Sequence, residues 1–214
     1  MTSRSGPRAA RRPGRPVGAD AEQTRERIMQ AAYEVINERG FAAATFQEIA
    51  KRSGLSRPTL NYYFASREEL YRALLAQAHD VVSSCIRVAK QHDGTLDRLH
   101  AYIDALVAAW RRDHAVVGFL VNARMEAYRH PDLPAASVAA TRGFLGEVVA
   151  EAIVRRELPA HTEHAMLVEL LYSMLWGVGA YSGWQGRPID VPEIAKQLHL
   201  VLGNGLLPIA ERDS

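Results

Sequence analysis

The amino-acid sequence predicts an all-α protein of about nine helices. Apolar residues recur at intervals of three and four along most of the chain, which is the period of an amphipathic helix. No segment alternates between apolar and polar residues as a half-buried strand does. Capping residues, glycines and prolines divide the chain into segments of helix length. The 214 residues suffice for one or two domains with an ample core.

The N-terminal residues predict a basic arm followed by a first helix. Residues 1–18 are mostly Arg, Pro, Gly and Ser, so this arm is expected to be disordered. Asp20 with Gln23 can cap the first helix, and Gly40 can end it. The apolar stripe of this helix is Ile28, Ala32, Val35 and Ile36.

Residues 45–64 predict two short helices around a tight turn. Thr45 and Glu48 have the spacing of a capping box, and Gly54 can adopt the left-handed conformation that ends the first helix. Ser56 can cap the second helix, 57–64, which turns Leu60 and Phe64 inward. The outward residues of the second helix are Arg57, Thr59, Asn61 and Tyr62. A short helix with a polar outer face after a glycine turn is typical of a helix-turn-helix that enters the DNA major groove.

The remaining sequence predicts six further helices. Ser66 and Glu69 form another capping box, which opens a long helix expected to link two domains. Gly94, Pro131, Pro159 and Pro192 lie at the expected breaks or starts. The expected helices cover about 67–90, 96–110, 116–127, 134–158 and 163–181, and a last one from residue 192.

Charge and cysteine content narrow the class of protein. Residues 1–66 hold 11 Lys and Arg against 6 Asp and Glu, whereas residues 67–214 hold 15 against 18. A basic N-terminal module on a mildly acidic body is typical of a nucleic-acid-binding protein with a second domain. Cys85 is the only cysteine, which excludes internal disulfides and cysteine-rich zinc modules. Without an apolar signal segment or a long apolar run, the protein is expected to be soluble and cytoplasmic.

The helix-turn-helix region resembles the DNA-binding domain of the tetracycline-repressor (TetR) family of bacterial transcription regulators. The resemblance extends over about 23–75, roughly a quarter of the chain, and its motifs follow one another at the family's separations. These motifs are Thr45, Ile49-Ala50, Gly54-Leu55-Ser56, Tyr62-Tyr63-Phe64 and Ser66-Arg67-Glu68-Glu69-Leu70.

The resemblance implies a domain organisation and a set of partners. It implies a helix-turn-helix domain at 19–66 and a helical ligand-binding and dimerisation domain at 67–210. The expected protein is a homodimeric transcriptional regulator, a repressor in most such proteins, which leaves a pseudo-palindromic operator in double-stranded DNA when a small hydrophobic effector binds. The alternative is a DNA binder of the same type that is controlled by a protein partner. No cofactor is expected.

The resemblance also implies which residues contact DNA. Arg57 can bridge guanine and Asn61 can pair with adenine in the major groove. Many family members have Gly in place of Pro58 and Tyr in place of Asn61, so no operator sequence is transferred. Tyr63 has a second interpretation, since it can instead pack beside Phe64. The expected DNA-binding residues are Thr45, Arg57, Pro58, Thr59, Asn61, Tyr62, Tyr63 and Arg67.

The basic arm has two interpretations. Its Gly-Arg-Pro sequence around Arg15 is similar to part of an AT-hook, which inserts arginine into the narrow minor groove of A·T-rich DNA. In an AT-hook, however, Arg precedes the glycine, whereas this chain has Pro13 there. A solubilising tail is the alternative. The residues of the hypothetical minor-groove arm are Arg11, Arg12 and Arg15.

Two sets of residues are assigned to the second domain. The resemblance implies an effector pocket, which aromatic side chains with a few polar neighbours could line, although any one aromatic residue at helical spacing is more often plain core. These candidates are Trp110, Phe119, Asn122, Met125, Tyr128, Phe144, Tyr172 and Trp176. The 163–181 helix is apolar on several faces, which favours a dimer interface over a purely internal core. The interface candidates are Leu167, Leu171, Met174, Leu175, Val178, Leu198, Val201 and Leu202.

The sequence lacks the motifs of the common enzyme classes. It contains no glycine-rich phosphate loop, nucleophile elbow or His-Glu-x-x-His helix. His161 and His164 lie three residues apart without a nearby cysteine or a well-spaced carboxylate, so they are expected to have surface or capping roles. Neither an enzyme nor a metal site is therefore expected.

Overall fold

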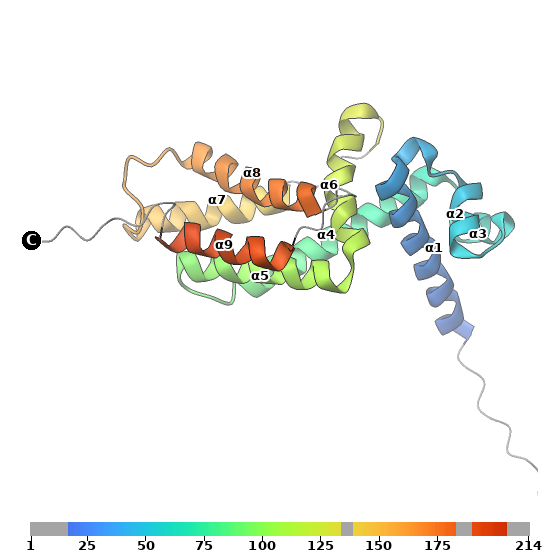
Figure 1. The fold of residues 1–214 in the computed structure, drawn as a ribbon, viewed down its shortest axis with the longest axis horizontal. Coiled ribbons are helices and arrows are strands. Elements are labelled where there is room, and N and C mark those ends of the chain that lie inside the picture. Colours follow the sequence, from blue (N-terminus) through green and yellow to red (C-terminus); the bar gives the residue numbers. More distant parts are fainter. Residues whose placement is uncertain (1–16, 134–138, 183–189, 205–214) are drawn as a thin grey trace, which may run out of the picture.

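All regular secondary structure in the described part of the chain is helical, which confirms the predicted fold class. The computed structural model describes residues 17–133, 139–182 and 190–204, and these residues form nine α-helices and one short 3-10 helix. Helices α1 to α3 lie at one end of the molecule and α5, α7, α8 and α9 at the other, while α4 connects the two ends and α6 crosses between them (Figure 1).

Helix α1 begins earlier than the sequence predicts. It runs from Val17 to Arg39, so Asp20 lies inside the first turns, where its carbonyl oxygen accepts a hydrogen bond from Thr24 Oγ1 at 2.8 Å. The expected cap at Asp20 is therefore wrong, because an uncapped helix can start wherever its backbone remains helical. The minor-groove candidates Arg11, Arg12 and Arg15 lie outside the described residues.

The helix-turn-helix forms where its capping residues predict it. A 3-10 turn, Phe41–Ala43, leads into α2, Phe46–Ser53, and then α3, Arg57–Tyr63. Thr45 and Ser56 accept the amides of Glu48 and Thr59, each at 3.2 Å, and Gly54 ends α2 with φ +67°. Only half of the first capping box forms, since Glu48 Oε1 accepts from Arg39 at 3.0 Å and Thr45 N donates to the Ala43 carbonyl at 2.8 Å.

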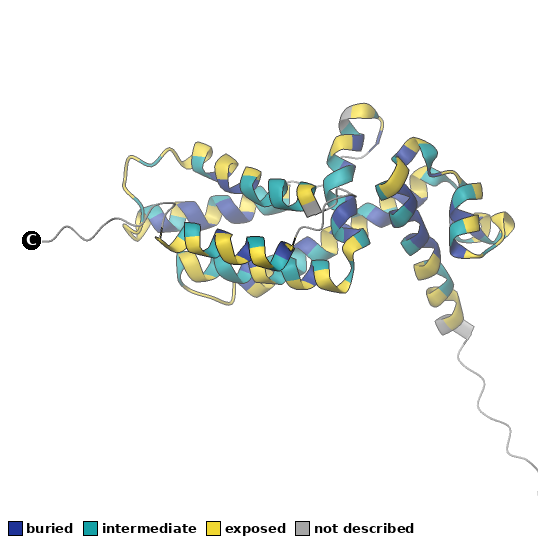
Figure 2. Ribbon diagram, in the orientation of Figure 1, coloured by how far each residue is buried: buried dark blue, intermediate teal, exposed yellow. Residues whose placement is uncertain are grey.

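The rest of the described chain consists of six helices that bury the sides on which they pack together (Figure 2). Helix α7 ends at Val154 and not near Pro159, because Arg156 adopts the left-handed conformation with φ 62°. The expected start of this helix at Pro134 lies outside the described residues. The helices are α4 Arg67–Ala89, α5 Thr95–Arg112, α6 His114–Arg129, α7 Ala139–Val154, α8 His164–Ser182 and α9 Val191–Asn204.

The hydrophobic cores do not follow the expected boundary at residue 66. The core around α1 to α4 also contains Val116, Phe119 and Ala123 from α6. A neighbouring residue of α6, Val117, packs against the second core, which α4, α5, α7 and α8 share. Helix α6 therefore contacts the helix-turn-helix end on one face and the bundle on another.

Candidate DNA-binding surface and effector cavity

Helix α3 separates an anchoring face from an exposed polar face. Leu60 is fully buried and Phe64, which follows the helix, is 2% exposed, so hydrophobic contacts fix the orientation of α3. On the opposite side, Tyr62 is 84% exposed. The side chains that share this exposure are Arg57, Pro58 and Asn61, with Thr59 partly buried. The helix thus presents hydrogen-bonding groups to solvent at the outer end of the molecule (Figure 1).

The other expected DNA-contacting residues have partners within the protein. Thr45 is exposed, but its hydroxyl caps α2. Tyr63 is partly buried and packs against the first core, with its ring edge-on to Tyr62 at 5.2 Å. Arg67 donates to the carbonyl oxygens of Phe41 and Ala42 at 3.4 and 3.3 Å. These three residues therefore stabilise the helix-turn-helix through contacts inside the protein.

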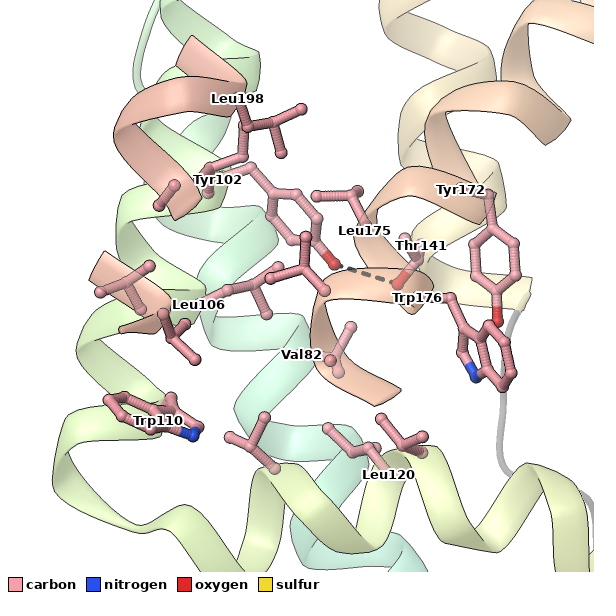
Figure 3. Close-up of a pocket in the computed structure, with 18 residues that line it drawn as sticks. Val82, Tyr102, Leu106, Trp110, Leu120, Thr141, Tyr172, Leu175, Trp176 and Leu198 are labelled. Atoms are coloured by element: carbon pink, nitrogen blue, oxygen red, sulfur yellow. Dashed lines mark hydrogen bonds between the residues drawn. The ribbon is translucent and has the colours of Figure 1, made fainter. Parts of the chain in front are cut away.

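A mostly apolar cavity opens between α4, α5, α6, α7, α8 and α9. Its volume is about 160 Å³, comparable to a cavity of about 150 Å³ that accommodates benzene in another protein. Figure 3 shows side chains from these helices converging on it. The lining residues are Val82, Tyr102, Ile103, Leu106, Val107, Trp110, Val117, Leu120, Val121, Thr141, Tyr172, Leu175, Trp176, Val178, Gly179, Val191, Ala195 and Leu198, none of which is charged.

A few polar atoms interrupt the apolar lining. Tyr102 Oη and Thr141 Oγ1 lie 3.0 Å apart in a hydrogen bond, and burial raises the pKa of Tyr102 to about 12, so its hydroxyl stays neutral. Trp176 Nε1 is buried without a hydrogen-bond partner among the described residues. Beside the cavity, Arg124 Nη1 donates to Tyr172 Oη at 2.9 Å, and its guanidinium lies over the Tyr172 and Trp176 rings at 5.2 and 5.5 Å.

Comparisons with known proteins agree with this arrangement. The family model of bacterial regulatory proteins of the tetR family matches residues 28–74, which include the helix-turn-helix. The chain is 30% identical over 184 residues to the HTH-type transcriptional regulator BetI of Escherichia coli O157:H7, a match that covers 78% of this chain and 86% of BetI. The chain belongs to the TetR family. It is therefore a DNA-binding transcriptional regulator and not an enzyme.

Solved structures of other proteins share the fold. The transcriptional regulator FadR from Bacillus subtilis, solved in complex with stearoyl-CoA, has a TM-score of 0.67 at 15% identity over 85% of this chain and 99% of FadR. AibR, solved with isovaleryl coenzyme A and operator DNA, has a TM-score of 0.66 at 15% identity over 83% of this chain and 97% of AibR. At such identities the likeness establishes the fold alone.

The cavity of this TetR-family chain includes only part of the residue set expected from the sequence. Trp110, Tyr172 and Trp176 line it. Phe119 instead lies in the first core, edge-on to Tyr33 at 5.0 Å, and Phe144 packs against Tyr102 with ring centroids 4.9 Å apart. Aromatic residues at helical spacing do not reveal which face of their helix meets the cavity, and neither Phe119 nor Phe144 lines it.

The polar and flexible candidates also lie elsewhere. Asn122 Nδ2 donates to Asn37 Oδ1 of α1 at 3.0 Å, so it bridges helices and does not line the cavity. Met125 is 41% exposed, and the side chain of Tyr128 lies outside the described residues. Tyr102 and Thr141 were not expected in the cavity, because their only sequence signal was a hydroxyl near an apolar stripe.

The residues expected at the dimer interface are engaged within the protomer. Leu171 and Leu198 are buried, and Leu175 and Val178 line the cavity. The other candidates, Leu167, Met174, Val201 and Leu202, are partly buried. The apolar side chains that α8 exposes are Met166, Leu170 and Tyr181, at 64%, 57% and 52%. Their spacing of four and eleven residues places them on one face of the helix.

The described residues lack two other kinds of feature. No helix there is long and apolar enough to cross a membrane. No group of three or more His, Cys, Asp and Glu side chains there has the geometry to hold a metal ion. His164 of α8 lies with its Nε2 3.0 Å from the Gly146 carbonyl oxygen, a contact that joins α7 and α8.

Proposed function

We propose that this TetR-family protein is a homodimeric repressor that binds a pseudo-palindromic operator through α3 and leaves it when a small, largely apolar effector binds. The observation that carries the DNA-binding half is the exposed face of α3, where Arg57 and Asn61 are exposed while Leu60 is buried. A rigidly anchored short helix with exposed amide and guanidinium groups suits direct readout of base edges.

A dimer formed through the exposed face of α8 would account for a two-fold symmetric operator. Met166, Leu170 and Tyr181 form an apolar stripe that a second copy can cover, with Leu200 of α9, 53% exposed, as a neighbouring candidate. Two copies related by a two-fold axis would present two α3 helices to half-sites about 34–36 Å apart, or a multiple of that distance. In this proposal, Met166, Leu170 and Tyr181 take the place of the buried leucines as the interface residues.

The cavity supports an effector whose inserted part is uncharged and compact. A charged group would lose its hydration in a lining without countercharges, so any charged portion of the ligand belongs outside it. Trp176 Nε1 offers a hydrogen bond to an acceptor such as a carbonyl oxygen. Since FadR and AibR were solved with acyl-CoA molecules, we infer that a short acyl thioester is a suitable candidate, with its polar part near Arg124.

The cavity also favours a metabolite over a protein partner. A regulator that answers to another protein needs an exposed apolar surface for it, and the α8 stripe is assigned here to the second copy. An open apolar cavity inside the helical bundle has no role in such an arrangement. The protein-controlled alternative therefore has less support.

Selection of bound DNA from a random-sequence pool at two salt concentrations tests the operator. Enrichment of an inverted repeat that persists at the higher salt concentration is expected for a specific dimeric regulator. Binding that enriches no motif and is lost steeply with salt would mean backbone-directed, non-specific binding and would contradict the proposal.

Tryptophan fluorescence tests the effector, because Trp110 and Trp176 line the cavity. We expect isovaleryl-CoA to change the fluorescence at lower concentration than stearoyl-CoA, since a stearoyl chain exceeds a cavity of about 160 Å³. Free coenzyme A is the control for binding of the nucleotide portion alone. Equal responses to coenzyme A and to both thioesters would contradict an acyl-binding cavity.

A further inference from the structure

One carboxylate lies buried at the junction between α6 and the helix-turn-helix. Glu126 is 3% exposed and is the only charged side chain in the buried class among the described residues. A buried carboxylate is costly unless hydrogen bonds and opposite charge compensate it. The contacts of Glu126 therefore have to explain its burial.

The contacts of Glu126 reach the turn that precedes α2. Its Oε2 accepts a hydrogen bond from the backbone amide of Phe41 at 3.1 Å, across 85 residues of sequence. Its Oε1 pairs with Arg129 at 2.9 Å, and His130 Nε2 lies 3.7 Å from Oε2. Gly40 has φ +79°, and a β-carbon there would lie 3.2 Å from Oε1. The glycine therefore supplies both the backbone conformation and the space for the carboxylate.

The same turn is held from its other side by α4. Arg67 donates to the Phe41 carbonyl oxygen at 3.4 Å, and its guanidinium lies 4.2 Å from the centre of the Phe41 ring. Tyr71 packs edge-on against that ring at 4.9 Å, and burial, together with the charge of Glu126, raises the pKa of Tyr71. Phe41 is thus fixed by α6 at its N–H and by α4 at its C=O, four residues before the cap of α2.

Helix α6 also forms part of the effector cavity. Val117, Leu120 and Val121 line the cavity, whereas Glu126 and Asn122 make the contacts to the N-terminal helices. In Figure 1, α6 stands between the bundle and the helix-turn-helix end. A shift of this helix caused by an occupant of the cavity would therefore move the group that holds the Phe41 amide.

We propose that Glu126 is a positioning residue that couples the cavity to DNA binding, by tying the turn at Phe41 to the position of α6. This inference rests on the proposed function. It explains how an effector in the cavity controls operator binding through one hydrogen bond. The Glu126 latch, meaning the hydrogen bond from Phe41 N to Glu126 Oε2, passes a displacement of α6 directly to the turn that precedes α2.

A substitution in the cavity wall can move α6 without any effector. Gly179 of α8 faces α6, and a β-carbon added there would lie 3.0 Å from Val121 Cγ2. Because the β-branched Val121 side chain is stiff, it passes this displacement on to α6. Gly143→Ala is the matched control, since a β-carbon at that position of α7 meets nothing within 4 Å. Each substitution is combined with intact Glu126, with Glu126→Ala and with Glu126→Gln in the full chain.

Two measurements on these variants test the latch. The first is the Kd for the operator obtained by selection. We expect Gly179→Ala to raise this Kd by about 2- to 30-fold with intact Glu126 and with Glu126→Gln, because both side chains can accept the Phe41 amide. In the Glu126→Ala background, Gly179→Ala should have little further effect on the operator Kd. The second is hydrogen exchange of the Phe41 amide in the free protein, which Gly179→Ala should accelerate only where residue 126 can accept a hydrogen bond.

The outcomes distinguish the latch from a merely structural role. If Gly179→Ala acts equally with and without Glu126, or has no effect on operator binding or exchange in the wild-type background, the coupling role of Glu126 is wrong. A lower melting temperature of Glu126→Ala with additive effects in the cycle would assign Glu126 to stability alone. If the wild-type chain binds no specific operator, the proposed function fails, while the exchange measurement still decides whether the latch exists.

Discussion

The side chains of α3 fall into two groups, those that anchor the helix in the core and those that face solvent. Leu60 is fully buried, whereas Arg57 and Asn61 are exposed one turn apart. The buried residue sets the orientation of the helix, and the exposed ones remain able to form bidentate hydrogen bonds with bases. Changes to the exposed pair should therefore alter recognition without altering the fold.

We expect Arg57→Ala and Asn61→Ala each to weaken binding to the selected operator by about 1–3 kcal/mol and to relax base preference at one position of each half-site. Fluorescence anisotropy with operator and single-base variants measures both effects. Arg87→Ala, which removes an exposed arginine from α4, is the charge-matched control. A loss in the control as large as that in Arg57→Ala would mean that α3 contributes charge and not readout.

Another residue-level prediction concerns the ion pair between α1 and α2. Hydrogen bonds from Arg52, at 2.8 and 2.6 Å, lower the pKa of Glu38 below its ordinary value of 4.5. A carboxyl with a lowered folded-state pKa stabilises the fold above its unfolded pKa, and this contribution is lost as the pH falls through the folded pKa.

We therefore expect Glu38→Gln to lower the free energy of unfolding at pH 7, by less than about 1 kcal/mol because the pair is solvent-accessible. At about pH 3, which is below the ordinary pKa of 4.5, the difference from wild type should shrink, since the carboxyl is then protonated in the unfolded wild-type chain. Urea denaturation at the two pH values measures it. A difference that stays constant between the two would show that the carboxylate charge is not the cause.

At the scale of the element, local capping decides where the recognition helix begins. Ser56 Oγ accepts the Thr59 amide at 3.2 Å and also lies 2.8 Å from Thr59 Oγ1. Helix α3 has only seven residues, so it depends on its cap and on its buried face more than a long helix does. By contrast, α8 has nineteen residues.

We expect Ser56→Ala to reduce the free energy of unfolding by about 1 kcal/mol through loss of the cap. Ser84→Ala, inside α4, should be nearly neutral, because alanine is a good helix former there. Thermal unfolding followed by circular dichroism compares the two variants. Equal destabilisation by both variants would show that the Ser56 cap does not stabilise α3.

At the scale of the whole molecule, exposure decides which face of α8 is available to a second copy. Leu171 and Leu175 pack inside the protomer, whereas Leu170 is 57% exposed. Exposed apolar area that recurs along one helix is unfavourable in water and is relieved by association. Dimerisation, and with it the spacing of the two α3 helices, should depend on this stripe.

We expect Leu170→Glu to convert the proposed dimer to a monomer and to weaken operator binding strongly, with its helix content unchanged. Val154→Glu is the control, since Val154 is 82% exposed but lies at the end of α7. Sedimentation equilibrium gives the oligomeric state of each variant. A Leu170→Glu protein that remains dimeric would mean that the two copies meet through another surface.

Local chemistry was enough to predict the helix-turn-helix and the all-helical class from the amino-acid sequence. Thr45, Gly54 and Ser56 act within a few residues of their own position, so their residue types specify the ends of α2 and α3. The helical period also located the bundle helices, although the end of α7 at the left-handed Arg156 had no sequence signal.

The faces along which the helices meet became known only from the packing in three dimensions. Phe119 and Trp110 look alike in an apolar pattern, yet one lies in the core around α1 to α4 and the other lines the cavity. The sequence does not reveal what Glu126 contacts, but the crossing of α6 places it against the Phe41 amide. Periodicity specifies that a face is buried, whereas the packing partner depends on contacts between residues far apart in the chain.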